Sequence, residues 1–129
     1  MDRVALTELL ENLIDGWENE IVEFKEARND FDTHRIGEYF SALSNEANLR
    51  GKDRAWLVFG VSDRTRRVTG TRYREEPQRL LGLKQQVAQD TEPSITFRNI
   101  HELLHPDGRV LLFEIPPAPR GIPISWKGH

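Results

Sequence analysis

Three carboxylates stand where strands of a sheet would begin and end. Glu18 and Glu23 flank the entry to an alternating segment, residues 20–27, and Asp63 follows the apolar run 55–61. Because neighbouring strands bring their ends to one edge of a sheet, the three side chains can converge. Converging carboxylates repel one another and need a cation, and their hard oxygen atoms suit Mg²⁺ or Mn²⁺. Such an ion would activate water against a phosphodiester. The alternative is ordinary: a loop glutamate, a solvated strand residue and a turn former.

The second chemical feature is a basic stretch, RTRRVTGTRYR at residues 64–74. Its five arginines are Arg64, Arg66, Arg67, Arg72 and Arg74. A guanidinium offers a planar fork of donors to a phosphate, and Tyr73 could stack on an unpaired base. Lys25 shares a strand face with Glu23 and could neutralise another phosphate. The stretch predicts a nucleic acid, RNA or DNA, as partner. The alternative is a solvated hairpin whose arginines pair with the acidic N-terminal region.

Three stretches carry apolar residues at helical spacing: 6–14, 36–47 and 80–87. Gly16 predicts the end of the first helix, Asp32 or Thr33 the start of the second, and Pro77 the start of the third. The inward residues of the third helix are predicted to be Leu80, Leu81, Leu83 and Val87. A polar segment, residues 50–54, ends the second helix.

Alternating and apolar runs predict strands over residues 20–27, 55–61, 67–71, 94–103, 110–115 and 124–126. The run 55–61 is apolar on both faces, which predicts a central strand. The turn residues Pro106, Asp107 and Gly108 make a hairpin of residues 94–115. The order of elements predicts a mixed α/β (α+β) fold, with a central mixed β-sheet flanked by about three helices.

Length and composition exclude several classes of protein. The chain has 129 residues, which fits one domain, and a net charge of −3, which excludes a basic coat over the whole surface. No cysteine is present, so disulfides, cysteine–zinc sites and cysteine nucleophiles are excluded.

No apolar run approaches the roughly 20 residues that span a bilayer, and no signal peptide is recognisable, so we expect a cytoplasmic protein without a membrane segment. Neither a phosphate-binding glycine loop nor a dinucleotide motif occurs, so no ATP site is evident. The four histidines lack metal-ligand spacing and are interpreted as surface residues.

Five short motifs in order resemble the Schlafen AlbA-like domain family, which is also labelled a divergent AAA-type DNA-binding domain. They are E-x-x-x-x-E-F-K at 18–25, F-S-A-L-S-N at 40–45, L-V-F-G-V-S-D at 57–63, V-T-G at 68–70 and P-x-P-R-G-I-P at 117–123. The resemblance spans residues 16–128, nearly the whole chain. The chain departs from the family pattern at residues 45–54, where many members carry an Asn-Thr-x-Gly-Gly stretch.

The resemblance implies a nucleic-acid-binding domain. In bacteria such a domain usually forms the N-terminal part of a longer transcriptional regulator, helicase-related or ATP-binding protein. We therefore expect residues 1–129 to be a single domain of that kind. In vertebrate Schlafen proteins a similar domain is a metal-dependent ribonuclease that cleaves structured RNA such as tRNA. Its acidic triad corresponds to Glu18, Glu23 and Asp63, so a metal-dependent endoribonuclease is the alternative function.

A third hypothesis is a protein-interaction or dimerisation module. Trp17, Trp56 and Trp126 would supply interface area, although Trp56 also suits the core. The vertebrate nuclease builds its groove from two such domains. A single copy would therefore form a homodimer or bind nucleic acid more weakly.

Overall fold

A four-stranded mixed sheet forms the centre of the chain. The computed structural model describes residues 1–16 and 20–128. The elements in chain order are α1 (Arg3–Ile14), β1 (Val22–Lys25), α2 (Thr33–Leu49), β2 (Ala55–Phe59), α3 (Pro77–Asp90), β3 (Thr91–Glu92), β4 (Asn99–His105), β5 (Gly108–Ile115) and β6 (Ser125–Trp126). The strands of the main sheet are ordered β1-β2-β5-β4, and β3 pairs with β6 in a small second sheet. Strand β1 is parallel to β2, and the other pairs are antiparallel. The predicted α+β class is confirmed.

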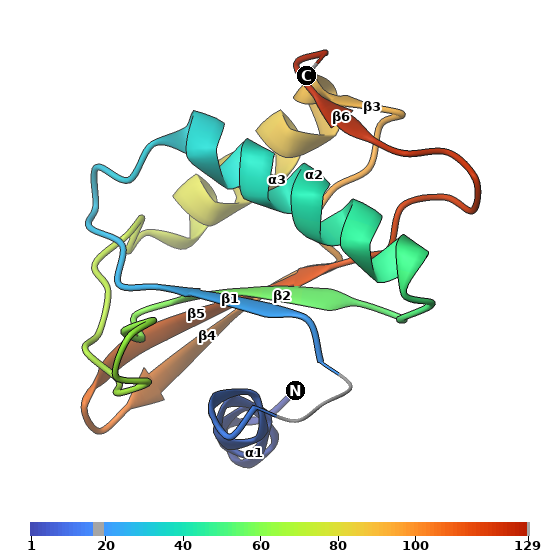
Figure 1. Cartoon of the computed structure of the whole chain (residues 1–129). Helices are drawn as coiled ribbons and strands as arrows, with labels where there is room; N and C mark the ends of the chain where they lie inside the picture. The colour runs from blue at the N-terminus through green and yellow to red at the C-terminus, as the bar shows by residue number, and fades with distance from the viewer. Residues whose placement is uncertain (17–19, 129) are drawn as a thin grey trace.

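The sheet lies between two helical layers (Figure 1). Helices α2 and α3 cover one face and α1 lies against the other. All five residues of β2 are buried, and their side chains alternate between the layers. Leu57 and Phe59 join the apolar cluster under α2 and α3, whereas Trp56 and Val58 join the cluster under α1. This confirms a central strand that is apolar on both faces.

The helix boundaries follow the predicted signals. The carboxylate of Asp32 accepts a hydrogen bond from the backbone N–H of His34 at 2.9 Å and caps α2. Pro77 is the first residue of α3, where its missing N–H costs no hydrogen bond. Leu83 and Val87 are buried as predicted, but Leu81 is 56% exposed. The prediction for Leu81 was wrong because α3 lies over the face of the sheet at β4, the last strand of the order, and no further strand extends under that side of the helix.

Two strand predictions need correction. Residues 67–71 form no strand, since their single ladder contact is a bridge between Val61 and Val68. The next backbone N–H groups, of Thr69 and Gly70, both bond to the carbonyl of Gly60 and turn the chain away. Residues 94–98 precede β4 instead of belonging to it.

The segment before β4 is held by α3. The hydroxyl groups of Ser94 and Thr96 donate to the carbonyls of Ala88 and Lys84 in that helix. These bonds hold residues 94–96 against α3, and the chain reaches β5 only at Arg98, whose N–H donates to the carbonyl of Glu114 at 2.8 Å. The predicted turn between the hairpin strands is confirmed, with His105 paired to Gly108.

The region that departs from the family pattern, residues 45–54, includes the last turn of α2 and the link to β2. Asn45 donates from its amide to the carbonyl of Ile124 at 3.0 Å and accepts from the N–H of Ile124 at 2.8 Å. This reciprocal pair ties the C-terminal segment to α2. Across the described ranges, none of the helices combines the length and apolar character that a membrane crossing requires.

Candidate nucleic-acid interface

The parallel strands β1 and β2 end side by side, and the segments that follow them enclose an open depression. Lys25 lies opposite Phe59 in the register, and the carbonyl of Lys25 accepts from the N–H of Gly60 at 2.8 Å. The depression has a volume of about 560 Å³, and its lining comprises Phe24, Lys25, Glu26, Ser62, Asp63, Arg64, Thr65 and Thr69. The fold therefore places Lys25, Asp63 and Arg64 along one surface hollow.

A compact loop, residues 60–75, forms one wall of this hollow. The hydroxyl of Ser62 accepts from the N–H of Thr65 at 3.2 Å, and the carbonyl of Ser62 accepts from the N–H of Arg66 at 2.8 Å. At its start, Gly60 has a φ of 98°, and a Cβ there would lie 2.6 Å from the carbonyl oxygen of Arg109. Only glycine allows the loop to pack this closely on the β4–β5 hairpin.

The five arginines of the basic stretch divide by what holds their side chains. Within the described part of the chain, no hydrogen bond or ion pair engages the guanidinium of Arg64 or Arg67. Arg72 is 87% exposed at its side chain and contacts Glu75 at 3.2 Å. Arg64 and Arg67 thus leave their donors to solvent, Arg72 uses only its Nε, and none of the three pairs with the acidic α1 region.

The other two arginines serve the scaffold to different degrees. Arg74 donates to the carbonyl of Arg79 at 2.7 Å and to the hydroxyl of Thr33 at 3.3 Å. The guanidinium carbon of Arg66 lies 4.4 Å from the ring centroid of Phe24, and its Nη2 lies 3.9 Å from Asp63. The side chain of Arg74 is therefore held by the scaffold, whereas Arg66 lies over the ring of Phe24 and beside Asp63.

Tyr73 does not have the predicted stacking role. Its side chain is buried in the α2–α3 cluster, with the ring 5.2 Å from that of Phe59 in an edge-on arrangement. Burial raises the pKa of Tyr73 above its usual value. The ring is a core residue and presents no face to a base, so the prediction was wrong.

Lys25 is held in its charged form at the rim of the hollow. Its Nζ lies 5.2 Å from the ring centroid of Tyr39 and 3.5 Å from the carboxylate of Glu23. The hydrogen bond with Tyr39, with the charge of Glu23 in support, raises the pKa of Lys25. The side chain is 27% exposed, so a phosphate can reach the ammonium group.

The three predicted carboxylates are only partly placed. Glu18 lies outside the described residues. Asp63 lines the hollow and is 63% exposed at its side chain, whereas Glu23 pairs with Lys25 and does not line the hollow. In residues 1–16 and 20–128, no three histidine or acidic side chains group closely enough to hold a metal ion. The Mg²⁺ or Mn²⁺ site, which includes Glu18, stays a prediction.

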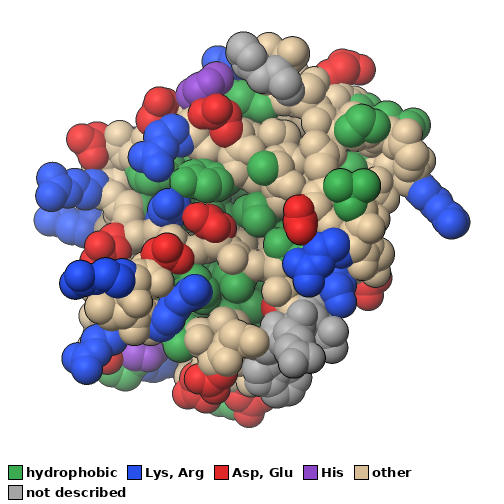
Figure 2. Space-filling model, in the orientation of Figure 1, with side chains coloured by type: hydrophobic (Ala, Val, Ile, Leu, Met, Phe, Trp, Pro, Cys, Tyr) green, Lys and Arg blue, Asp and Glu red, His purple; other side chains and the backbone are tan. Residues whose placement is uncertain are grey.

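A second depression continues the first along the same two chain segments. Its lining residues include Arg28 and Arg72, together with Ala27, Asn29, Gly70, Thr71 and Glu75. Figure 2 shows Lys and Arg side chains gathered, with acidic ones between them, on the side where Figure 1 places the loops after β1 and β2. Arg28 was missed in the sequence because it stands alone among acidic neighbours.

Arg109 on β5 was also missed, and it holds the basic loop in place. Its guanidinium donates to the carbonyls of Thr71, Tyr73 and Arg74, at 3.3, 2.7 and 3.1 Å. Its Nε donates to Glu102 at 2.7 Å. One largely buried arginine, 11% exposed at its side chain, thus fixes three backbone carbonyls of the segment that carries Arg72. A single arginine after a turn gives no signal of this role in the sequence.

The opposite end of the sheet holds a polar cluster that the sequence did not predict. Glu114 on β5 is buried, and its carboxylate lies 3.2 Å from His101, 3.3 Å from Asn99, 3.4 Å from Arg98 and 3.9 Å from Arg54. Burial by itself raises the pKa of Glu114. The hydrogen bonds from His101 and Asn99 and the charges of the two arginines outweigh burial, so the net pKa is lowered. His101 is 14% exposed at its side chain, so its interpretation as a surface residue was wrong.

The tryptophans do not form the predicted interaction surface. Trp56 and Trp126 are buried in the two apolar clusters, which confirms the core alternative for Trp56. Trp17 lies outside the described residues. Neither tryptophan that the structure describes can supply interface area.

The chain is a mixed α+β domain, in which a mixed sheet lies between helical layers and a cationic loop follows its second strand. The chain belongs to the Schlafen, AlbA_2 family, whose model matches residues 18–129. The fold is also similar to that of two solved bacterial structures.

One is the N-terminal domain of a protein related to the ATP-dependent DNA helicase RecG, from Nitrosomonas europaea. The identity is 21%, the TM-score is 0.59, and the match covers 88% of this chain and 73% of that domain. The other is the DIP2311 protein from Corynebacterium diphtheriae, with 18% identity, a TM-score of 0.59 and coverage of 97% of this chain and 23% of that one. No protein of curated function matches the chain.

Proposed function

We propose that this chain is a nucleic-acid-binding domain that holds the phosphate backbone in the hollow between β1 and the loop 60–75. The observation that carries the proposal is a pair of unengaged guanidinium groups, of Arg64 and Arg67, on the loop that forms one wall of the hollow. Arg64 lines the hollow beside Lys25, and the guanidinium groups of Arg64 and Arg67 have no hydrogen bond or ion pair with the described residues. Unpaired guanidinium groups on a rigid loop are ready donors for phosphate oxygens.

The spacing of the cations favours an extended strand of phosphates over a single anion. The hollow that holds Lys25 and Arg64 is followed by the depression that holds Arg28 and Arg72. Both lie between the same two chain segments, so one nucleic-acid backbone could contact the two pairs of cations in turn. The family and the RecG-related neighbour, a protein named for a DNA helicase, support the same class of partner.

The net charge of −3 does not oppose this proposal, because the charge is unevenly distributed. The ten Asp and Glu residues among residues 1–32 outnumber three basic ones there, whereas residues 64–74 hold five arginines and no acid. Phosphate contacts release condensed counterions, so affinity should fall steeply with salt.

The test is binding of labelled tRNA and duplex DNA to the Arg64→Ala, Arg67→Ala double variant. Loss of two phosphate contacts should weaken binding about tenfold at low salt. The matched control is Arg50→Ala with Arg120→Ala, which removes the same charge from exposed positions away from the hollow. Equal losses in both double variants, or no binding by the native protein at low salt, would exclude this interface.

The second candidate is a metal-dependent endoribonuclease that acts on structured RNA such as tRNA. Asp63 favours it, because this exposed carboxylate lines the same hollow as Lys25 and Arg64 and would lie beside a bound phosphate. Glu18, Glu23 and Asp63 would hold Mg²⁺ or Mn²⁺, and the ion would supply an activated water. Within the hollow, Lys25 and Arg64 would position the phosphodiester.

Cleavage of tRNA in Mn²⁺ against EDTA tests this candidate. Glu23→Ala and Asp63→Ala should each abolish cleavage and leave binding intact or stronger, since each removes a negative charge near the phosphate. Asp107→Ala is the control, because Asp107 is an exposed acid in the β4–β5 turn. If the native protein binds tRNA but never cuts it with Mn²⁺ present, the nuclease candidate is contradicted. The proposal of a nucleic-acid-binding domain is then unaffected.

A further inference from the structure

Strand β4 is the long unprotected edge of the main sheet. The sheet has two edge strands, β1 with four residues and β4 with seven. Among the strands that the structure describes, β4 pairs only with β5, so backbone groups along its other side have no strand partner in residues 1–16 and 20–128. Strand β1 is short and carries Glu23 and Lys25, which are the charges that blunt an edge. Strand β4 is longer, carries one such charge, Glu102, and also carries Leu104 with 63% of its surface exposed.

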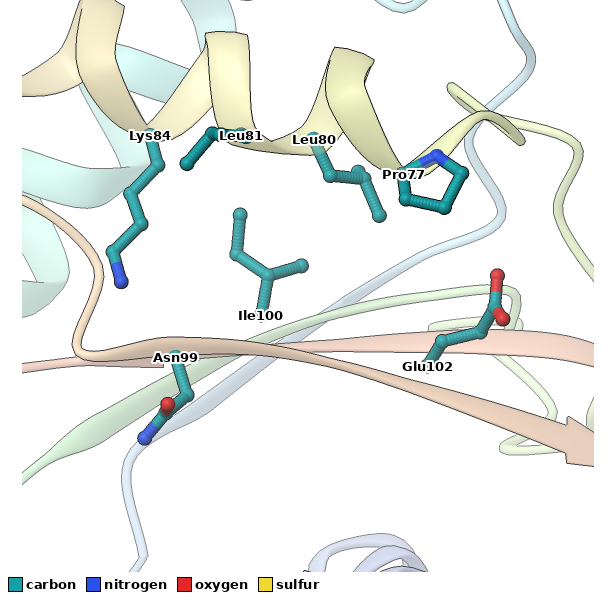
Figure 3. Close-up of a pocket in the computed structure, with 7 residues that line it drawn as sticks. All are labelled: Pro77, Leu80, Leu81, Lys84, Asn99, Ile100 and Glu102. Atoms are coloured by element: carbon teal, nitrogen blue, oxygen red, sulfur yellow. The ribbon is translucent and has the colours of Figure 1, made fainter.

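An apolar groove runs between this edge and α3 (Figure 3). Its volume is about 370 Å³. In the close-up, Leu80 and Leu81 of α3 hang over Ile100 of β4. Lys84 lies at one end of the groove and Glu102 toward the other. Leu81 is 56% exposed, so part of the apolar wall is open to solvent beside unpaired backbone.

We infer that the groove and β4 form a dimer interface with a second copy of this chain, paired through antiparallel β4 strands. Because side chains at even positions of β4 share one face, a register with Ile100 opposite Ile100 of the second copy keeps both grooves on the same face of the joined sheet. The two apolar walls then meet across the two-fold axis, and each Leu81 gains cover. Such an interface is isologous and closes on itself.

The charges at the two ends of the groove favour a second copy of this chain as its occupant. Nζ of Lys84 lies 3.4 Å from the carbonyl oxygen of Arg98, so the ammonium group stands at the level of residue 98. In the proposed register residue 98 lies opposite Glu102 of the second copy. Oε2 of Glu102 accepts from Arg109, and no described contact engages its other oxygen. Each Lys84 therefore faces a Glu102 across the axis, which gives two symmetric ion pairs.

The interface lies away from the candidate nucleic-acid site. The hollow follows the ends of β1 and β2, whereas β4 is at the other edge of the sheet. The dimer does not depend on nucleic-acid binding and would leave both hollows open. The dimer would therefore carry two copies of the cationic loop 60–75.

A single introduced cysteine tests the register, because the chain contains none. Residues directly opposite in an antiparallel pair have Cα atoms about 5 Å apart, within the range of a disulfide. Ile100→Cys should therefore give a covalent dimer under mild oxidation. Leu104→Cys is the control, since Leu104 is more exposed but its copies would lie about 27 Å apart. Cross-linking of Leu104→Cys as fast as Ile100→Cys would overturn the proposal.

Charge reversal tests the ion pairs by sedimentation over a wide range of protein concentration. Lys84→Glu should raise the dimer dissociation constant by about tenfold or more, because two attractive pairs become repulsive. Lys84→Glu with Glu102→Lys should restore the native constant, and Leu49→Lys, at an exposed leucine at the end of α2, should not change it. A native protein that stays monomeric at every concentration, or a double reversal that fails to restore pairing while remaining folded, contradicts the interface.

Discussion

The two ends of the main sheet use the same residue types in opposite ways. At the end of β1 and β2, Arg64 and Arg67 point their charges at solvent, and Asp63 is exposed beside them. At the other end, Glu114 is buried among two arginines, a histidine and an asparagine. The first end leaves the guanidinium groups of Arg64 and Arg67 without a described partner, whereas at the second end one carboxylate is shared by four polar side chains.

The difference separates a binding surface from a structural cluster. A buried carboxylate must keep its partners, since an unpaired charge in the interior is costly. Solvent-facing arginines contribute little to stability and remain available to a phosphate. An arginine count alone does not distinguish the two ends, but the partners of each guanidinium do.

The largest effect is expected from Glu114→Ala. The change leaves Arg54, Arg98 and His101 without their shared acceptor and should lower the free energy of unfolding by about 2 kcal/mol. Urea denaturation measures it, with Glu46→Ala as the control, because Glu46 makes an exposed pair with Arg50 at 3.8 Å. If the two variants lose the same stability, Glu114 does not hold this end of the sheet together.

The next effect is the pH dependence of the same cluster. The pKa of Glu114 is lower in the folded protein than its ordinary value of 4.5. Its contribution to stability is therefore fully present above pH 4.5 and is lost as pH falls through the folded-state pKa. The stability difference between native protein and Glu114→Gln should accordingly shrink from neutral pH toward pH 3. A difference that stays constant over that range would show that the carboxylate charge is not what stabilises the cluster.

A smaller effect distinguishes arginines within the basic stretch. Arg74→Ala removes two hydrogen bonds to the scaffold and should cost about 1 kcal/mol of stability. Arg64→Ala removes a guanidinium with no such bond and should leave the melting temperature unchanged. Thermal unfolding of the two variants side by side makes the measurement, and equal melting temperatures would contradict the division of the arginines.

The smallest effect is on the salt dependence of binding. If Arg64 contacts one phosphate, Arg64→Ala should reduce the slope of log affinity against log salt by about 1 for duplex DNA. Arg74→Ala should leave the slope unchanged while the protein stays folded. An unchanged slope for Arg64→Ala would place its guanidinium away from the nucleic acid.

Much of the fold could be predicted because it rests on local patterns. The apolar run around Leu57 has to be a central strand, and the capping residue Asp32 and Pro77 mark helix starts by their own chemistry. Leu81 could not be placed in the same way, because its exposure depends on where α3 ends relative to the sheet. Residues 67–71 include strand-forming types, but the backbone N–H groups of Thr69 and Gly70 both donate to the carbonyl of Gly60 instead of to a strand partner.

Only part of the candidate site could be predicted, because the roles of its other residues depend on tertiary packing. Strand order brings Lys25 near Asp63 and Arg64, and motif spacing could indicate that. Tyr73 and Arg74 look like further ligands in the sequence, but packing places one in the core and binds the other to α2 and α3. Partners far away in the chain, such as Arg109 and Glu114, had no local signal.

The loop 60–75 is anchored at its base by backbone. Gly60 lies against the carbonyl of Arg109, and a Cβ on Gly70 would lie 3.1 Å from the Cα of Gly108. Because these anchor points involve no side chain of residues 62–67, that short segment can be exchanged as a unit, provided that Arg66 is kept over the ring of Phe24. Replacing it while keeping the glycines should let the domain be retargeted to another ligand without redesign of its core.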